Sequence, residues 1–382
     1  IPQDTLGEYN YLKGLLDRPD RKAKTVTNGY ENFTSSEWPV MTYSFFCFGA
    51  RNLALKDPTL KADASRYMRL AIERLMRSQY YDFIVGHFGN PFQDSEVKDN
   101  AFYLGHLTLM LATYREVSGD SLFDGWFHKF ARAFYENYKE SPTCSLDSYK
   151  DMCWVSEQTV PLRALKIHDD IFGTNYAEVI SRWESTMKAR FIDKNSGLLI
   201  THFNKNTGRV YEGPRTITES FTIIFLYDIL PDFCRDLYIN MKKELLVNRL
   251  GFPFFKEYLG NKQYANADTG PIIWGVSPVS SSFAMGSAAA MDDQKVYQPL
   301  RFASEVFGLG VTFDGRKKYL VGGAIGTSVL FFSKSLALFS KQPRITLSLK
   351  NIIFLYSLLG IIVALLLLSI KRLIHNWVLF FR

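Results

Sequence analysis

The sequence has 382 residues, of which 47% are hydrophobic and 15% aromatic, so it can bury a large core. An intrinsically disordered chain is excluded, because such chains are poor in these residues. The formal net charge is +7, but Lys and Arg are spread along the chain and form no dense basic block. We therefore expect no nucleic-acid partner, since such proteins gather their basic residues on one face.

Helices are predicted in pairs along the chain. An apolar segment such as LGHLTLMLATY precedes a short break, and a more amphipathic segment such as SLFDGWFHKFARAFYENY follows it. A Ser, Thr or Asp that can cap the next helix stands at each break. The breaks lie about 60 residues apart, at Asp57, Asp120, Thr174, Asp232 and Asp292.

This asymmetry predicts buried inner helices and outer helices with one face in water. A sixth apolar helix, YLVGGAIGTSVLFFSKSLALF, completes the series, and six pairs are enough to close a ring. The predicted fold is therefore all-α, an (α/α)6 toroid over residues 1–345. One small hairpin is expected within LLITHFNKNTGRVY, turning at residues 206–208.

Residues 346–382 form a second region with a predicted transmembrane helix. The nineteen residues 352–370 carry no charge, which is enough to cross a bilayer core of about 30 Å. Lys and Arg flank this segment on both sides, so the positive-inside rule assigns no orientation. The sequence begins at Ile1 rather than Met and carries the sequon Asn32-Phe33-Thr34. We therefore expect a single-pass membrane protein with the toroid on the extracytoplasmic side.

Candidate chemistry is expected at the mouth of the ring, where the inner helices begin. Glu37 precedes the first inner helix and Tyr43 lies within it, while His106 lies in the first turns of the second. Each also has a purely structural explanation, a helix cap for Glu37 and a hydrogen-bonded core position for Tyr43 and His106.

Two loops also converge on the mouth. CSLDSYKDMC, with Cys144 and Cys153, precedes the third inner helix, and NADTGPIIWG, with Asp268 and Trp274, precedes the fifth. The cysteines can meet only if their loop folds back, and buried small residues are the ordinary alternative. Four cysteines without a cysteine–histidine cluster predict neither a disulfide scaffold nor a metal site.

A likeness to a known family lies in the segments CSLDSYKDMC, IHDDIFGTNYAEVISRW and FIDKNSGLLITHFNKNTGRVYEGPRTITESF. Together with DNAFYLGHLTLMLATYREVSGD they resemble the linalool dehydratase/isomerase family, over about residues 35–340. The resemblance implies an α/α toroid that dehydrates tertiary terpene alcohols, or moves their hydroxyl group, without a cofactor. The expected partners are thus a small lipophilic alcohol and a membrane. A homo-oligomer is compatible with the ring-shaped members of the family, but no residue specifies it.

Catalytic roles implied by the resemblance fall on Glu37, Tyr43, His106, Cys144 and Cys153. Acid–base chemistry would protonate the leaving hydroxyl and remove a proton from a neighbouring carbon. Cys153, close to a helix N-terminus, would have a lowered thiol pKa.

Substrate contacts are expected from Phe102, Tyr149, Asp268 and Trp274. Two departures from the family concern Glu37, where an aspartate is expected, and Lys150, where an apolar residue would face a terpene. The lysine indicates either a more polar substrate or a loop turned outward.

Two other functions fit a toroid. A carbohydrate-processing enzyme would need two carboxylates across the mouth, for which Glu37, Asp268 and Glu157 are available. A non-catalytic domain of a membrane assembly would have a mouth filled by its own side chains.

Overall fold

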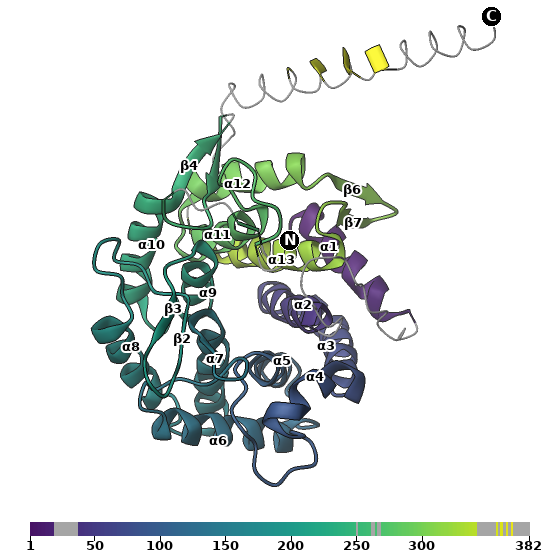
Figure 1. Cartoon of the computed structure of the whole chain (residues 1–382). Coiled ribbons are helices and arrows are strands. Elements are labelled where there is room, and N and C mark those ends of the chain that lie inside the picture. Colours follow the sequence, from purple (N-terminus) through teal and green to yellow (C-terminus); the bar gives the residue numbers. More distant parts are fainter. Residues whose placement is uncertain are drawn as a thin grey trace, which may run out of the picture.

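The computed structural model describes residues 1–18, 37–249, 251–260, 264–265 and 269–341, together with isolated positions between 357 and 369. Helices dominate this part of the chain and are arranged as two concentric layers (Figure 1). The predicted all-α toroid is confirmed as the fold of the described residues.

Six inner helices form the closed ring at the centre of Figure 1. Each packs against the next one along the chain, and the last packs against the first, so the ring has no open end. Side chains on nearly every face are buried, as in α5, which explains why these helices lack a polar stripe. In chain order they are α2 (Glu37–Lys56), α5 (Tyr103–Ser118), α7 (Val155–Phe172), α9 (Thr216–Leu226), α11 (Pro278–Ala290) and α13 (Gly323–Leu336).

Outer helices cover this ring and bury one face each. On α6 the buried residues Phe127, Phe130, Phe134 and Tyr138 recur at helical spacing, whereas the other face is exposed. The outer helices are α1 (Gln3–Leu16), α3 (Lys61–Leu75), α6 (Asp124–Glu140), α8 (Glu178–Arg190), α10 (Pro231–Leu245) and α12 (Gln294–Phe307). Shorter elements are α4 (Ser78–Phe88) and the 3₁₀ helices η1 (Pro58–Leu60) and η2 (Ala337–Phe339).

The predicted breaks separate each inner helix from the outer helix that follows it. Asp57 caps η1 by accepting a hydrogen bond from the Thr59 amide at 3.1 Å. Asp232 lies in the first turn of α10. At the last break the capping side chain belongs to Asp293, one residue beyond the predicted Asp292.

Short antiparallel sheets connect outer helices to the next inner helix. The predicted hairpin is confirmed, with β2 (His202–Phe203) and β3 (Val210–Glu212) on either side of Gly208, whose φ is 73°. β1 (Cys153–Trp154) pairs with β2 and makes a three-stranded sheet. The expectation of a single hairpin is wrong, because two more are present. These are β4 (Leu246–Arg249) with β5 (Phe252–Phe255), and β6 (Gly310–Phe313) with β7 (Arg316–Tyr319).

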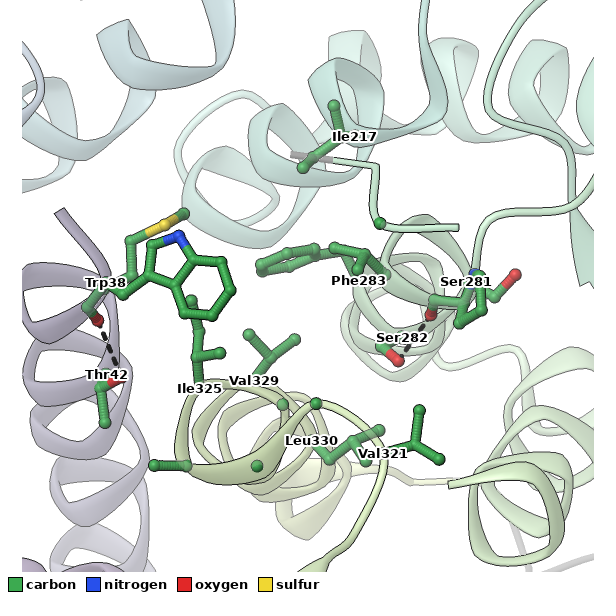
Figure 2. A pocket seen from close by; sticks show the side chains of 18 of the residues that line it. Trp38, Thr42, Ile217, Ser281, Ser282, Phe283, Val321, Ile325, Val329 and Leu330 are labelled. Atoms are coloured by element: carbon green, nitrogen blue, oxygen red, sulfur yellow. Dashed lines mark hydrogen bonds between the residues drawn. The ribbon is translucent and has the colours of Figure 1, made fainter. Parts of the chain in front are cut away.

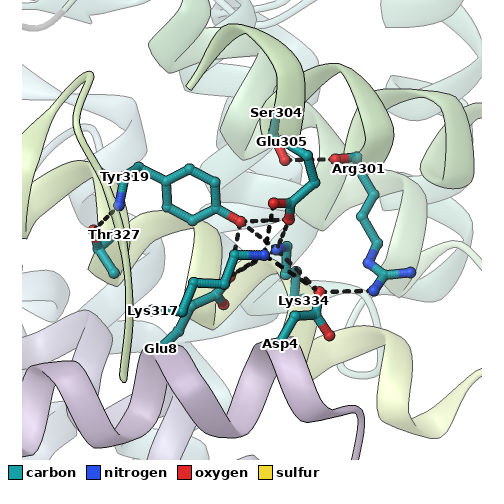
Figure 3. A network of polar contacts seen from close by, with 9 residues as sticks. All are labelled: Asp4, Glu8, Arg301, Ser304, Glu305, Lys317, Tyr319, Thr327 and Lys334. Carbon is teal, nitrogen blue, oxygen red and sulfur yellow. Dashed lines mark hydrogen bonds and ion pairs between the residues drawn. The ribbon is translucent and has the colours of Figure 1, made fainter. Parts of the chain in front are cut away.

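A buried ionic network fastens α1 to the end of the ring (Figure 3). At its centre, the Lys334 ammonium on α13 donates to Glu8 at 2.7 Å, to Glu305 at 2.6 Å and to the Tyr319 hydroxyl at 2.5 Å. The carboxylates of Asp4, Glu8 and Glu305 are balanced by the cations Lys334, Lys317 and Arg301. The opposite charges are close and equal in number, but burial still raises the pKa of Glu8 above its ordinary value.

Within the described part of the chain, no helix is both long and apolar enough to span a membrane. The span predicted over residues 352–370 falls largely outside the described residues. It therefore stays a prediction.

Candidate active site

A cavity of about 1120 Å³ opens at the end of the ring where the inner helices begin. This exceeds the roughly 300–1,000 Å³ typical of small-molecule sites. Figure 2 shows the wall formed by α2, α11 and α13, with Trp38, Phe283 and Val329 around one space. The mouth is thus the candidate site, as the helix pattern predicts, and it is not filled by its own side chains.

Most of the lining is aliphatic or aromatic. Among the described residues, the charged side chains that reach the cavity are those of Glu37, Arg74 and Glu157. All three come from one side of the ring, on α2, α3 and α7. The cavity therefore has one polar wall in an otherwise apolar space.

Glu157 and His106 meet at this wall. The Glu157 Oε2 atom lies 3.3 Å from His106 Nε2, and the imidazole is fully buried behind the carboxyl group. The other nitrogen of the imidazole, His106 Nδ1, lies 2.8 Å from Ser44 Oγ. The Ser44 hydroxyl also lies 3.2 Å from the Met41 carbonyl, so it can donate either to that oxygen or to Nδ1.

This contact has a chemical consequence. A carboxyl group and an imidazole are both groups that give and take protons in enzymes, and here they lie side by side. At 3.3 Å the two atoms are close, but their geometry is not that of a hydrogen bond. The Glu157–His106 pair is therefore a candidate acid–base pair at the cavity surface.

The loop before α7 holds Glu157 in place. Its neighbour Gln158 accepts from the Leu146 amide at 2.7 Å and donates to the Leu146 carbonyl at 3.0 Å. Trp154, the N-cap residue of α7, stacks on His202 with ring centroids 4.8 Å apart. Glu157 lies in the first turn of α7.

Tyr43 stands on the same wall, supported by a buried guanidinium. Arg74 Nη1 donates to the Tyr43 hydroxyl at 3.3 Å, while Nη2 donates to the Leu16 carbonyl at 2.6 Å. Because the hydroxyl oxygen accepts from Arg74, its own proton is directed elsewhere and can serve a ligand. Glu37, half-buried at the start of α2, also lines the cavity.

An aromatic pair completes this side. Phe102 and Tyr149 stack with centroids 5.8 Å apart, and Phe102 packs edge-on against the His106 ring at 5.5 Å. Both line the cavity. Lys150, next to Tyr149, is exposed and is not part of the lining, so the loop turns it outward.

The two predicted cysteines lie elsewhere. Their loop folds back, with the Ser148 amide donating to the Met152 carbonyl at 2.8 Å. Both thiols are free and fully buried, however, and neither lines the cavity. The Cys144 thiol faces the Val179 carbonyl of α8 at 3.7 Å.

Burial also corrects the expected acidity of the thiols. It raises the pKa of Cys144 to about 11, and it raises that of Cys153, for which a lowered pKa was expected, well above its ordinary value. The reason is that desolvation of a fully buried thiolate outweighs the nearby helix N-terminus.

The other two predicted substrate contacts are Trp274 and Asp268. Trp274 is 64% exposed and does not line the cavity, although Pro271 and Ile273 of the same loop do. Asp268 lies outside the described residues. The sequence analysis missed Arg74, and it weighed Glu157 only as part of a carboxylate pair.

The fold and the cavity define an α/α toroid with a large apolar pocket and a carboxyl–imidazole contact in its wall. Residues 126–301, from α6 into α12, match the family model of linalool dehydratase/isomerase. The match includes Glu157 and both loop cysteines but begins after His106.

Solved structures with similar folds are enzymes that process carbohydrates. An unsaturated glucuronyl hydrolase specific for heparin has a TM-score of 0.56 at 12% identity, covering 89% of this chain and 98% of its own. A polysaccharide lyase has a TM-score of 0.55 at 10% identity, covering 90% and 99%. A family 105 glycoside hydrolase from C. acetobutylicum has a TM-score of 0.54 at 9% identity, covering 88% and 99%. At these identities the likeness establishes the α/α-toroid fold alone.

Proposed function

We propose that this protein is a lyase or isomerase that dehydrates a lipophilic allylic alcohol, or moves its hydroxyl group, in the cavity at the mouth of the ring. The observation that carries the proposal is the Glu157–His106 pair, a carboxyl group and an imidazole in close contact in the wall of a large apolar cavity. The match of residues 126–301 to linalool dehydratase/isomerase supports the same class of reaction.

The first step is protonation of the leaving group. The Glu157 carboxyl group gives its proton to the substrate hydroxyl, and the C–O bond breaks with both electrons leaving on water. His106 lies against the carboxyl group, which takes up a proton from water at the end of a dehydration cycle, while Glu37 gives its proton to water. The Tyr43 hydroxyl donates a hydrogen bond to the departing oxygen, and Arg74 keeps that hydroxyl in position.

The second step removes a proton. The allylic cation lies against the faces of Phe102 and Tyr149, whose π electrons stabilise positive charge. Loss of a proton from a neighbouring carbon to the Glu37 carboxylate gives the alkene. Return of water to the other end of the allyl system gives the isomeric alcohol instead. Both reactions are redox-neutral, so they require no electron carrier.

Neither thiol has a part in this scheme. Cys144 and Cys153 lie outside the cavity lining with raised pKa values, which makes them poor proton donors or nucleophiles toward a ligand there. The membrane span expected over residues 352–370 belongs to the proposal as well, because it would hold the cavity close to a lipid-dissolved substrate.

Carbohydrate processing is the second candidate function. Its support is the fold of the similar structures, together with two carboxylates, Glu37 and Glu157, in the lining. The mainly aliphatic lining favours the first proposal, since a sugar would need many polar partners for its hydroxyls.

Turnover of the purified full-length chain in detergent tests the proposal. The chain is incubated with primary and tertiary allylic terpene alcohols, and the products are identified by gas chromatography and mass spectrometry. A dehydrated or isomerised product that disappears in Glu157→Gln supports it. Cleavage of glycosidic bonds, without conversion of any alcohol, would refute it in favour of the second candidate.

A further inference from the structure

The cavity extends beyond its polar wall into the outer helical layer. Residues of the outer helix α12, among them Leu300, Ala303 and Phe307, line it together with inner helices α11 and α13. We call this part of the cavity, lined by α11, α12 and α13, the apolar arm.

Glycines line the arm where α13 begins, and open space lies beside one of them, Gly323. Gly322, Gly323 and Gly326 stand in the lining without side chains. A Cβ atom at Gly323 would meet nothing within 4 Å, so the space beside it is open. Figure 2 shows Val321, Ile325, Val329 and Leu330 bordering the same region, all of them aliphatic.

The arm offers a ligand little to hydrogen-bond. Its serine hydroxyls already donate to the backbone, Ser282 to the Pro278 carbonyl at 2.8 Å and Ser304 to the Arg301 carbonyl at 2.7 Å. None of the charged residues that reach the cavity lies on α11, α12 or α13, within the described ranges. A ligand in the arm would therefore be held by apolar contact alone.

The volume is too large for a short alcohol. A ten-carbon alcohol has about eleven non-hydrogen atoms, and at roughly 30 Å³ for each it would occupy ~330 Å³. That is about a third of the 1120 Å³ cavity. The remainder would be apolar space in contact with water, which is unfavourable unless a hydrocarbon fills it.

We propose that the substrate is a long-chain isoprenoid-type alcohol, whose hydroxyl lies at the Glu157 wall and whose hydrocarbon tail fills the apolar arm. This inference rests on the proposed function for the position of the hydroxyl, and it adds the chain length and the direction of the tail.

Binding of unreactive alcohols tests it apart from catalysis. Saturated primary alcohols cannot form an allylic cation, so their affinity reports the cavity alone. Quenching of the lining residues Trp38 and Trp154 is measured in the full-length chain at fixed detergent concentration, corrected for partition into micelles without protein. Each methylene buried in the arm should raise affinity about fourfold, the equivalent of ~0.8 kcal/mol, until the arm is full.

Two substitutions should shorten the arm. Ala303→Phe and Ala324→Phe place a ring in its lining, and Ala133→Phe on the outer helix α6 is the matched control away from the cavity. We expect both arm variants to leave affinity for short alcohols within about twofold and to lower it for long ones at least tenfold. The Ala133 variant should follow the wild type at every length.

The outcomes separate the two proposals. Two results would overturn the long-chain inference, even if short allylic alcohols are converted. One is a wild-type affinity that stops rising at a short chain, and the other is an equal loss of affinity for short and long alcohols in the arm variants. The long-chain inference is supported if affinity rises steeply with chain length in the wild type and stops rising at a shorter chain in both arm variants. The same dependence without turnover of any allylic alcohol would refute the proposed function alone.

Discussion

Replacing Glu157 by glutamine removes the acid–base group with the least change of shape. The side chain keeps its length, and its amide can donate to His106 Nε2, which lies 3.3 Å from the present carboxyl oxygen. We therefore expect normal folding. Loss of a placed general acid typically costs about 10²–10⁴-fold in rate, so kcat should fall by that factor, about 2.7–5.5 kcal/mol in activation free energy. KM should change little, because the cavity lining is unaltered.

Product formation from an allylic alcohol is the assay, with thermal unfolding as the check on folding. Glu184→Gln on the outer helix α8, where the side chain pairs with Lys188, is the matched control and should keep wild-type kcat. Ser44→Ala removes the hydrogen-bond partner of His106 Nδ1 and should lower kcat about tenfold with a changed pH profile, as expected of a positioning residue. Should Glu157→Gln keep more than a tenth of wild-type kcat, the assignment of Glu157 as the acid is wrong.

Three further predictions concern buried groups. Lys334→Met leaves the carboxylates of its network without their central cation, so urea denaturation should show a loss of about 3–5 kcal/mol in the free energy of unfolding. Burial raises the pKa of Glu219 well above 4.5, so the folded chain keeps a proton that the unfolded chain loses above that pH. The free energy of unfolding should then fall as pH rises from about 4.5, and Glu219→Gln should flatten this slope and stabilise the chain at pH 7. Cys144 and Cys153, buried and with raised pKa values, should react with a maleimide only after unfolding, as read by mass spectrometry.

Each of these three predictions has a result that would contradict it, and the lysine prediction has a matched control. Lys318→Met, on the exposed face of β7, should change stability by less than about 0.5 kcal/mol, and an equal loss in both lysine variants would contradict the network's role. An unchanged pH slope in Glu219→Gln would show that this carboxyl group is not held neutral. Rapid labelling of the native cysteines, blocked by an alcohol, would place the thiols in the cavity and restore the pair that the family resemblance implies.

The ring could be predicted because its signals are local. Inner helices are apolar on nearly every face, outer helices carry a stripe, and capping residues such as Asp57 mark the breaks between them. The hairpins β4–β5 and β6–β7 were missed because β4 directly follows α10 and β6 begins three residues after α12 ends. A run of four residues, such as LVNR directly after α10, cannot be told from a helix end by its pattern.

Part of the site followed from its position in the chain. Glu37, Tyr43 and Phe102 line the cavity because inner helices begin at the mouth, and His106 reaches it through Glu157 on the neighbouring inner helix. Arg74 could not be predicted, since it comes from an outer helix and enters the wall only through tertiary packing.

The sequence pattern also could not predict the environment of the two cysteine thiols. Their loop does turn back, but the packing of Cys144 against α8 decides that its thiol is buried, and spacing along the chain carries no information about that contact. A raised rather than a lowered pKa follows from this burial.

The most direct test of the central claim is the conversion of a tertiary allylic alcohol by the full-length chain, followed by mass spectrometry in wild type and Glu157→Gln. The account predicts that the wild type releases an alkene or a rearranged alcohol without any added electron carrier, and that Glu157→Gln forms it at least about a hundredfold more slowly. Equal product formation by both proteins, or none from any allylic alcohol by the wild type, would contradict it.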